Sequence, residues 1–134
     1  MDKFNSCKIL LVDDDPSWQM LNKIVLEKQG FRMDSAYTKY EAFQKIQANR
    51  YEIAIVDLRL VDDADKNFDG LEVVKFLRKR SPSVRILVES GYLTPEVRKE
   101  LNAIDIDGIL DKATITNHDL AKRINQIHQE ITHR

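Results

Sequence analysis

The sequence has little of what stabilises or anchors small exported proteins. Cys7 is the only cysteine among 134 residues, so the chain cannot form an internal disulfide. No charged-then-apolar signal segment opens the sequence, and no apolar run approaches the length that spans a bilayer. These absences, and a length typical of one domain, predict a cytoplasmic single domain over residues 1–134, with its core over residues 8–131 and no output domain.

A charge excess of one sign is also missing. The 21 basic and 22 acidic residues leave a formal net charge of −1. Such a balance provides no general field that would attract nucleic acid or an anionic membrane surface, and we expect neither as a partner. Any strong charge effect must therefore be local.

His118, His128 and His133 lack neighbouring cysteines and the spacing of metal ligands, so we interpret them as surface residues.

The chain does have a regular alternation of two patterns. Five apolar segments rich in Ile, Val and Leu are separated by segments with helical spacing. The apolar segments are KILLV, FRMDSAY, EIAIVD, VRILVES and DGILDK. Strands and helices that alternate through short connections predict an α/β fold, a doubly wound five-stranded parallel sheet with five helices.

Each helical segment has an apolar face that predicts which side it buries. These faces are formed by Trp18, Leu21 and Val25; Phe43 and Ile46; Leu71, Val74 and Leu77; Val97, Leu101 and Ile104; and Leu120, Ile124, Ile127 and Ile131. Asp15 and Thr94, each followed by proline, predict helix starts. Thr38 with Glu41 predicts a capping box.

Polar side chains collect where the predicted strands end. Asp13 and Asp14 follow the first strand, and Asp57 ends the third. Ser90 ends the fourth strand, and Lys112 follows the fifth. Because open α/β sheets bind ligands beyond the carboxyl ends of their strands, we expect these side chains to converge.

The adjacent acidic residues Asp13 and Asp14 pose an electrostatic problem. Like charges at the edge of a low-dielectric interior repel one another, so a cation should offset them. Mg²⁺ prefers one or two carboxylates together with waters and phosphate oxygens. The pattern therefore predicts a Mg²⁺ site that draws a phosphoryl group toward an acceptor carboxylate, with Lys112 as a further positive charge.

Four motifs in this order, VDDD, IVDLRL, VESGY and LDK, carry a family resemblance. From about Lys8 to Ile131 the chain resembles the receiver domain of two-component response regulators, which implies the flavodoxin-like strand order 2-1-3-4-5. The resemblance also implies a role for each residue of the predicted site. These roles are phosphoacceptor and Mg²⁺ ligand for Asp57, further Mg²⁺ ligands for Asp13, Asp14 and the backbone carbonyl of Arg59, switch hydroxyl for Ser90, and phosphate-pairing lysine for Lys112.

The same resemblance implies how such a protein works. A receiver takes a phosphoryl group from a phosphohistidine of a sensor kinase or of a histidine phosphotransfer protein. It catalyses only its own phosphorylation and dephosphorylation, so we do not expect a metabolic enzyme. Without an output domain, the signal would leave by contact with a downstream protein or by onward phosphorelay.

The sequence departs from the receiver pattern in three places. The segment 58–69 is longer than usual and has Val61 where a proline is expected; Ile109 replaces an aromatic residue; and Ala113 replaces a proline. Because a non-proline cis bond costs about 2.5 to 4 kcal/mol, we expect a trans peptide before Ala113. Without the aromatic residue, we expect switching to depend more on residues 58–69, and Tyr92 is a candidate substitute.

The residues leave two alternatives open. Asp13 and Asp15 after an apolar strand also resemble the nucleophile and general acid of haloacid-dehalogenase-like phosphohydrolases. That enzyme class has no role for Asp57, and Asp15 is explained equally well as a helix N-cap. The second alternative is a receiver-like scaffold that is not phosphorylated, which the departures from the family pattern allow.

Overall fold

The computed structural model describes residues 7–59, 69–91 and 93–133. Strands and helices alternate along the chain, as the sequence predicts. The strands are β1 (Lys8–Val12), β2 (Arg32–Ala36), β3 (Ile53–Asp57), β4 (Arg85–Ser90) and β5 (Gly108–Asp111). The helices are α1 (Pro16–Lys28), α2 (Lys39–Ala48), α3 (Asp69–Arg80), α4 (Pro95–Asn102) and α5 (Asn117–Thr132).

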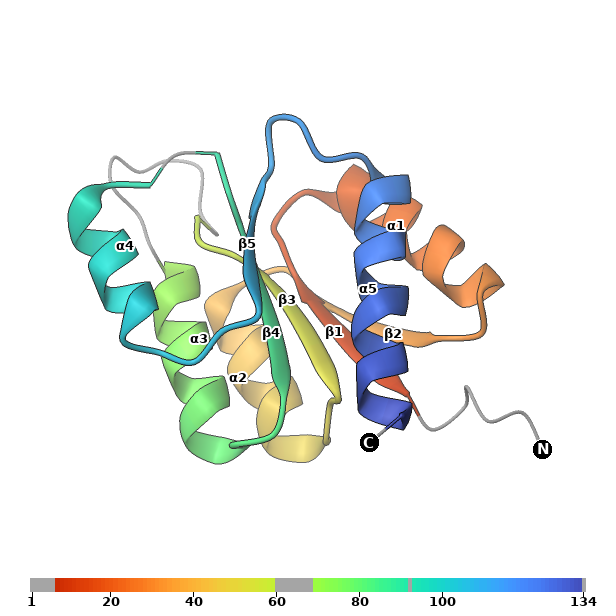
Figure 1. The fold of residues 1–134 in the computed structure, drawn as a ribbon, viewed down its shortest axis with the longest axis horizontal. Coiled ribbons are helices and arrows are strands. Elements are labelled where there is room, and N and C mark those ends of the chain that lie inside the picture. The colour runs from red at the N-terminus through yellow and green to blue at the C-terminus, as the bar shows by residue number, and fades with distance from the viewer. Residues whose placement is uncertain (1–6, 60–68, 92, 134) are drawn as a thin grey trace.

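The five strands form one parallel sheet in the order β2-β1-β3-β4-β5. Helices α1 and α5 cover one face of this sheet, and α2, α3 and α4 lie on the other side (Figure 1). This arrangement confirms the predicted doubly wound α/β fold. It also brings the carboxyl ends of all five strands to one edge, where the predicted site residues lie.

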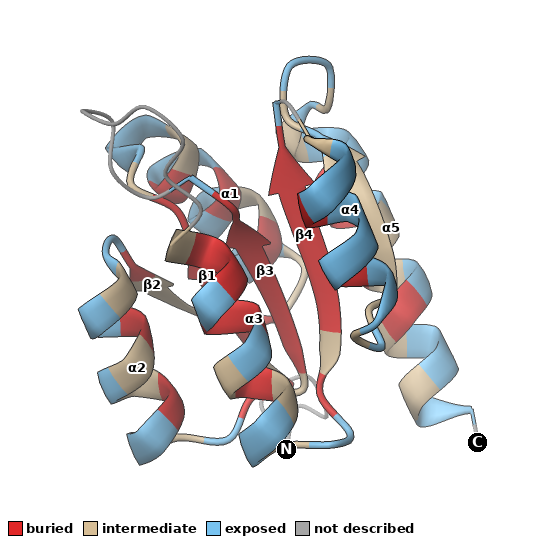
Figure 2. Cartoon of the chain, turned by 90° about the vertical axis from the view of Figure 1, so that its left-hand side faces the viewer, coloured by how far each residue is buried: buried red, intermediate tan, exposed pale blue. Residues whose placement is uncertain are grey.

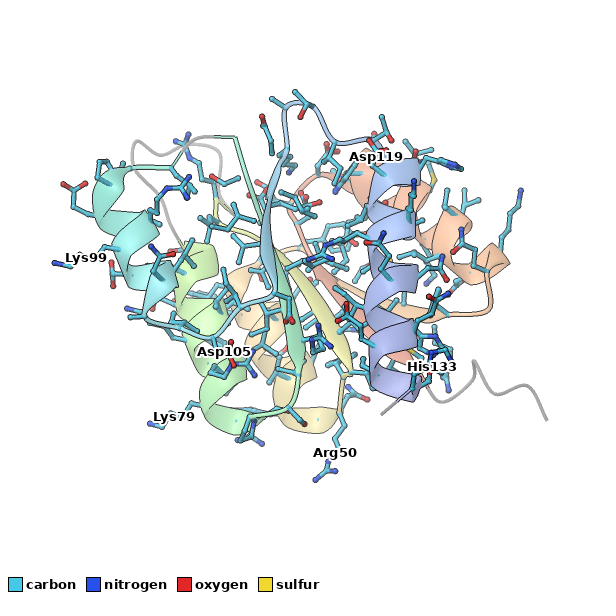
Figure 3. The ribbon with its side chains drawn as sticks, in the orientation of Figure 1. Arg50, Lys79, Lys99, Asp105, Asp119 and His133 are labelled. Carbon is cyan, nitrogen blue, oxygen red and sulfur yellow. The ribbon has the colours of Figure 1, made fainter. Side chains whose placement is uncertain are left out.

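Alternation along the strands divides the apolar side chains between two cores. Ile9 and Leu11 of β1 pack on the side of α1 and α5, whereas Leu10 and Val12 pack on the side of α2 and α3. Burial is deepest along β3 and β4, while the helices turn exposed faces outward (Figure 2). Charged and polar side chains such as Arg50 project into solvent (Figure 3). A buried strand residue therefore needs an apolar side chain or a specific polar partner.

Helix α1 corrects one predicted face. Leu21 is exposed, whereas Gln19, Asn22 and Leu26 are buried. The Gln19 side-chain amide donates hydrogen bonds to three backbone carbonyls, at distances of 3.0 to 3.1 Å. The prediction for Leu21 was wrong because apolar spacing alone does not identify a polar residue that the fold satisfies internally.

Helix starts agree with the sequence except in one detail. Thr38 caps α2 by accepting from the Glu41 amide, but the Glu41 carboxylate accepts from Tyr37 and not from Thr38 itself. A reciprocal capping box forms instead at Thr116 and Asp119, where α5 begins. The side chains of Asp15 and Thr94 accept hydrogen bonds at the starts of α1 and α4, as predicted.

Some predictions fall outside the described residues. Val61, Tyr92 and most of the segment 58–69 belong to this group, so the expectations about them stay predictions. The peptide bond before Ala113 is trans, as predicted, and the described residues contain no cis bond. No helix within the described ranges is long and apolar enough to cross a membrane.

Candidate functional site

Neighbouring strands place a row of carboxylates at the carboxyl edge of the sheet. Asp13 follows β1, and Asp57 ends the adjacent strand β3. One oxygen from each of Asp13, Asp14 and Asp57 lies within 4.8 Å of the other two. Asp13 is fully buried and Asp57 is 5% exposed, so water screens their repulsion only weakly. The acidic cluster predicted from the sequence therefore forms in the structure.

Lys112 lies against this cluster from the β5 side of the sheet. Its ammonium lies 2.6 Å from Asp57 Oδ2 and 2.8 Å from Asp13 Oδ2. The lysine follows β5, an edge strand, and reaches across β4 to contact both carboxylates. A single ammonium thus offsets the negative charge of two buried carboxylates, and both contacts join oppositely charged groups.

The carboxylates also accept backbone hydrogen bonds that fix their orientation. The amide of Asp15 donates to Asp13 Oδ1 at 2.9 Å, and the amide of Arg59 donates to Asp57 Oδ1 at 3.0 Å. Each acid therefore has one oxygen held by the backbone and the other paired with Lys112. The Arg59 prediction concerned its carbonyl; the structure shows its amide donating to Asp57, and the role of the carbonyl stays a prediction.

Ser90 lies at the end of β4, buried at 7% exposure, and its carbonyl accepts from the Lys112 amide at 3.1 Å. Asp14 is half-buried, and it is the most accessible of the three clustered acids. The predicted residues Asp13, Asp14, Asp57, Ser90 and Lys112 thus come from four different strand ends that meet at one edge of the sheet.

Glu89 is a polar residue of this region that the sequence analysis missed. It pairs with Asp57 in the register between β3 and β4, and it is fully buried. The indole nitrogen of Trp18 donates to both carboxylate oxygens, at 3.1 and 3.3 Å. Strand alternation was the signal that could have found it, since Glu89 lies two residues after Leu87 and so on the same sheet face.

Burial and pairing change the ionisation of these groups in different directions. Burial raises the pKa of Asp13, and this effect outweighs the lowering by Lys112 and the Asp15 amide. Burial and the charge of Asp13 raise the pKa of Glu89 to about 8. Burial alone would lower the pKa of Lys112, but hydrogen bonds to Asp13 and Asp57 raise it above its usual value. The ammonium is therefore held in its charged form.

The donor set fits a hard divalent cation. Three carboxylates within 4.8 Å present oxygen ligands only, and Asp14 leaves the group accessible from solvent. Mg²⁺ takes oxygen ligands and keeps several of its waters, which suits a half-open acidic cluster better than a closed cage. The residues present are therefore compatible with the predicted Mg²⁺ site.

Comparison with known proteins defines the class. The family model of the response regulator receiver domain matches residues 9–125. The chain belongs to this family, the receiver domains of two-component response regulators. The match spans the acidic cluster and Lys112 together, and it gives the hydrolase alternative no support.

Among curated proteins, the chain is 36% identical over 118 residues to the photosynthetic apparatus regulatory protein RegA of Rhodobacter capsulatus, covering 85% of this chain and 61% of that protein. It is 30% identical over 103 residues to the acid tolerance regulatory protein ActR of Rhizobium meliloti, covering 77% of this chain and 49% of that protein. The chain therefore spans less than two thirds of the length of either relative.

Solved structures agree with the family. A CheY-like response regulator receiver domain protein from Methanospirillum hungatei superposes with a TM-score of 0.82 at 26% identity, over 97% of this chain and 100% of that one. The response regulator TrrA from Thermotoga maritima, solved with Mg²⁺ and BeF, gives a TM-score of 0.71 at 26% identity, over 90% and 98% of the two chains.

Proposed function

We propose that this chain accepts a phosphoryl group on Asp57 and that Mg²⁺ is needed for the transfer. The observation that carries this proposal is the position of Asp57 between a buried acid, Asp13, and an ammonium, Lys112, at the open edge of the sheet. A buried carboxylate with such neighbours is better suited to chemistry than to stability, because removing it from water is costly.

The transfer would proceed from a phosphohistidine. An oxygen of Asp57 forms a bond to phosphorus as the bond from phosphorus to the imidazole nitrogen breaks, and the electron pair of that bond stays with the imidazole. The Arg59 amide holds Asp57 Oδ1, which leaves Oδ2, the oxygen now paired with Lys112, as the nucleophile. Once that oxygen is bonded to phosphorus, the Lys112 ammonium would pair with the negatively charged phosphoryl oxygens instead.

The acidic pair has a separate role in this proposal. Asp13, Asp14 and the Arg59 carbonyl would hold Mg²⁺ together with Asp57. The ion supplies positive charge that offsets the carboxylates and the incoming phosphoryl oxygens. Ser90 would serve as the hydroxyl that turns toward the phosphoryl group, which links the site to the end of β4.

Partners follow from the family and the relatives. We propose a histidine kinase or a histidine phosphotransfer protein as the donor and a protein as the recipient of the signal. The chain would act as a single receiver domain in the cytoplasm and catalyse only its own phosphorylation and dephosphorylation.

Labelling with a small phosphodonor, such as acetyl phosphate, tests this function. Intact-mass spectrometry should find one added phosphate in Mg²⁺ and none in EDTA. Labelling that is unaffected by EDTA would overturn the metal requirement. A chain that binds Mg²⁺ yet takes up no phosphate would instead support the non-phosphorylated scaffold.

A further inference from the structure

Glu89 has no place in the proposed transfer, yet it lies inside the site. Along each strand, alternate residues face the helices α1 and α5: Leu11 and then Asp13, Ile55 and then Asp57, Leu87 and then Glu89. Because β1, β3 and β4 are neighbours, Asp13, Asp57 and Glu89 form a row on one face of the sheet.

Like Asp13 and Asp57, Glu89 accepts a hydrogen bond from an identified donor. Trp18 Nε1 lies 3.1 and 3.3 Å from its two oxygens, and this bond joins residues that are 71 positions apart. Trp18 lies in the first turn of α1, which starts directly after the acidic residues that follow β1. The bond therefore connects the turn bearing Asp13 and Asp14 to the strand beyond Asp57.

The next residue of α1 anchors the same turn on the opposite side. The Gln19 side-chain amide donates to the carbonyls of Leu11, Asp13 and Ala36, which belong to β1, to the residue after it and to β2. Trp18 and Gln19 thus hold the first turn of α1 to β4 on one side of Asp57 and to β1 and β2 on the other.

From these contacts we infer that Glu89, through the indole of Trp18, is a positioning residue of the phosphorylation site: it fixes the turn carrying Asp13 and Asp14 relative to Asp57. This inference rests on the proposed function, since it assigns a purpose to the geometry of the acidic cluster. Partners behind metal ligands commonly change metal affinity by about 10- to 100-fold when they are removed.

Three variants separate position from charge. Trp18→Phe keeps an aromatic ring, smaller than the indole, and removes the N–H donor, and Glu89→Leu removes the acceptor. Glu89→Gln keeps an oxygen that accepts from the indole but cannot carry a negative charge at any pH. The exposed carboxylate of Glu100, which pairs with Lys75 on the surface, provides the control variant Glu100→Gln.

The first measurement is the Mg²⁺ dissociation constant of each full chain by isothermal titration calorimetry at one pH. Trp18→Phe and Glu89→Leu should weaken binding about tenfold or more, whereas Glu89→Gln and Glu100→Gln should stay near wild type. If Glu89→Gln weakens binding as much as Glu89→Leu, Glu89 acts by charge, and the inference is wrong. Unchanged binding in Glu89→Leu also overturns it.

The second measurement needs no metal and distinguishes the two proposals. In EDTA, amide hydrogen exchange at residues 14–18 should be faster in Trp18→Phe and Glu89→Leu than in wild type, with α5 unchanged. If wild type binds no Mg²⁺ but this local difference is present, the positioning role of Glu89 stands and the proposed function fails. If wild type binds Mg²⁺ but residues 14–18 exchange equally fast in all variants, the proposed function stands and the positioning role fails.

Discussion

Replacing Lys112 with methionine should destabilise the metal-free protein strongly. The ammonium pairs with Asp13, which is fully buried, and with Asp57, which is nearly so, at 2.8 and 2.6 Å. Removing one partner of a buried ion pair leaves an uncompensated charge and costs about 3 to 5 kcal/mol. Because the Lys112 side chain is 25% exposed, water screens part of this effect, and we expect a loss of about 2 to 4 kcal/mol.

Lys75→Met is the matched control. Lys75 makes an ion pair of similar length, 2.8 Å, with Glu100, but both side chains are about half exposed. Exposed pairs contribute at most about 1 kcal/mol to stability, so Lys75→Met should change the free energy of unfolding only slightly. The difference between the two variants isolates the effect of burial at the site.

Urea unfolding in EDTA and in Mg²⁺ measures both effects. Ligand binding to the folded state adds about 2.7 kcal/mol at 100 times the dissociation constant. Mg²⁺ should stabilise Lys112→Met more than wild type, since the carboxylate oxygens no longer pair with the ammonium. A Lys112→Met variant that is as stable as wild type in EDTA would refute this account of the charges.

Three further predictions concern the surroundings of the site. The pKa of Glu89 is about 8 in the folded chain, against an ordinary value of 4.5. Between pH 4.5 and pH 8 the folded chain therefore holds a proton that the unfolded chain has released. Stability in EDTA should therefore fall by a few kcal/mol from pH 5 to pH 9 in wild type, and much less in Glu89→Gln; equal slopes in urea unfolding would contradict this. A Cβ at Gly70 would lie 2.0 Å from the backbone oxygen of Asp57. Gly70→Ala should therefore lower the free energy of unfolding by more than about 2 kcal/mol and abolish most phosphate uptake. Gly91→Ala, whose Cβ has open space around it, should change that free energy by no more than about 0.5 kcal/mol. Mg²⁺ should change the emission of Trp18, the single tryptophan, through its bond to Glu89; a change that persists in a variant unable to bind Mg²⁺ would argue against this.

Much of the fold was predictable because strand and helix signals agreed along the whole chain. The five apolar segments contain the five observed strands, and right-handed connections leave few ways to arrange them. The strand order came from the family resemblance and not from periodicity. Leu21 was mispredicted because the buried face of α1 includes Gln19 and Asn22, whose burial depends on carbonyls that spacing does not reveal.

The convergence of the site was predictable for a geometric reason. Parallel strands end at one edge, so residues such as Asp57 and Lys112, which are 55 positions apart, meet without any local signal. The Glu89–Trp18 bond was not predicted, because its partners are 71 positions apart and the motif VESGY carries the family resemblance through Ser90 and not through Glu89. Strand alternation identifies Glu89 as inward-facing, but it does not identify the donor that satisfies it.

Locating the phosphate tests the central claim most directly. Wild type, Asp57→Asn and Asp13→Asn are each treated with acetyl phosphate in Mg²⁺, and peptide mapping of the labelled protein identifies the modified residue. The Asp57→Asn substitution keeps the shape of the side chain and removes the anionic nucleophile, so wild type should carry its phosphate on Asp57 and Asp57→Asn should carry none. Phosphate that persists in Asp57→Asn and is lost in Asp13→Asn would contradict the account and favour a hydrolase with Asp13 as its nucleophile.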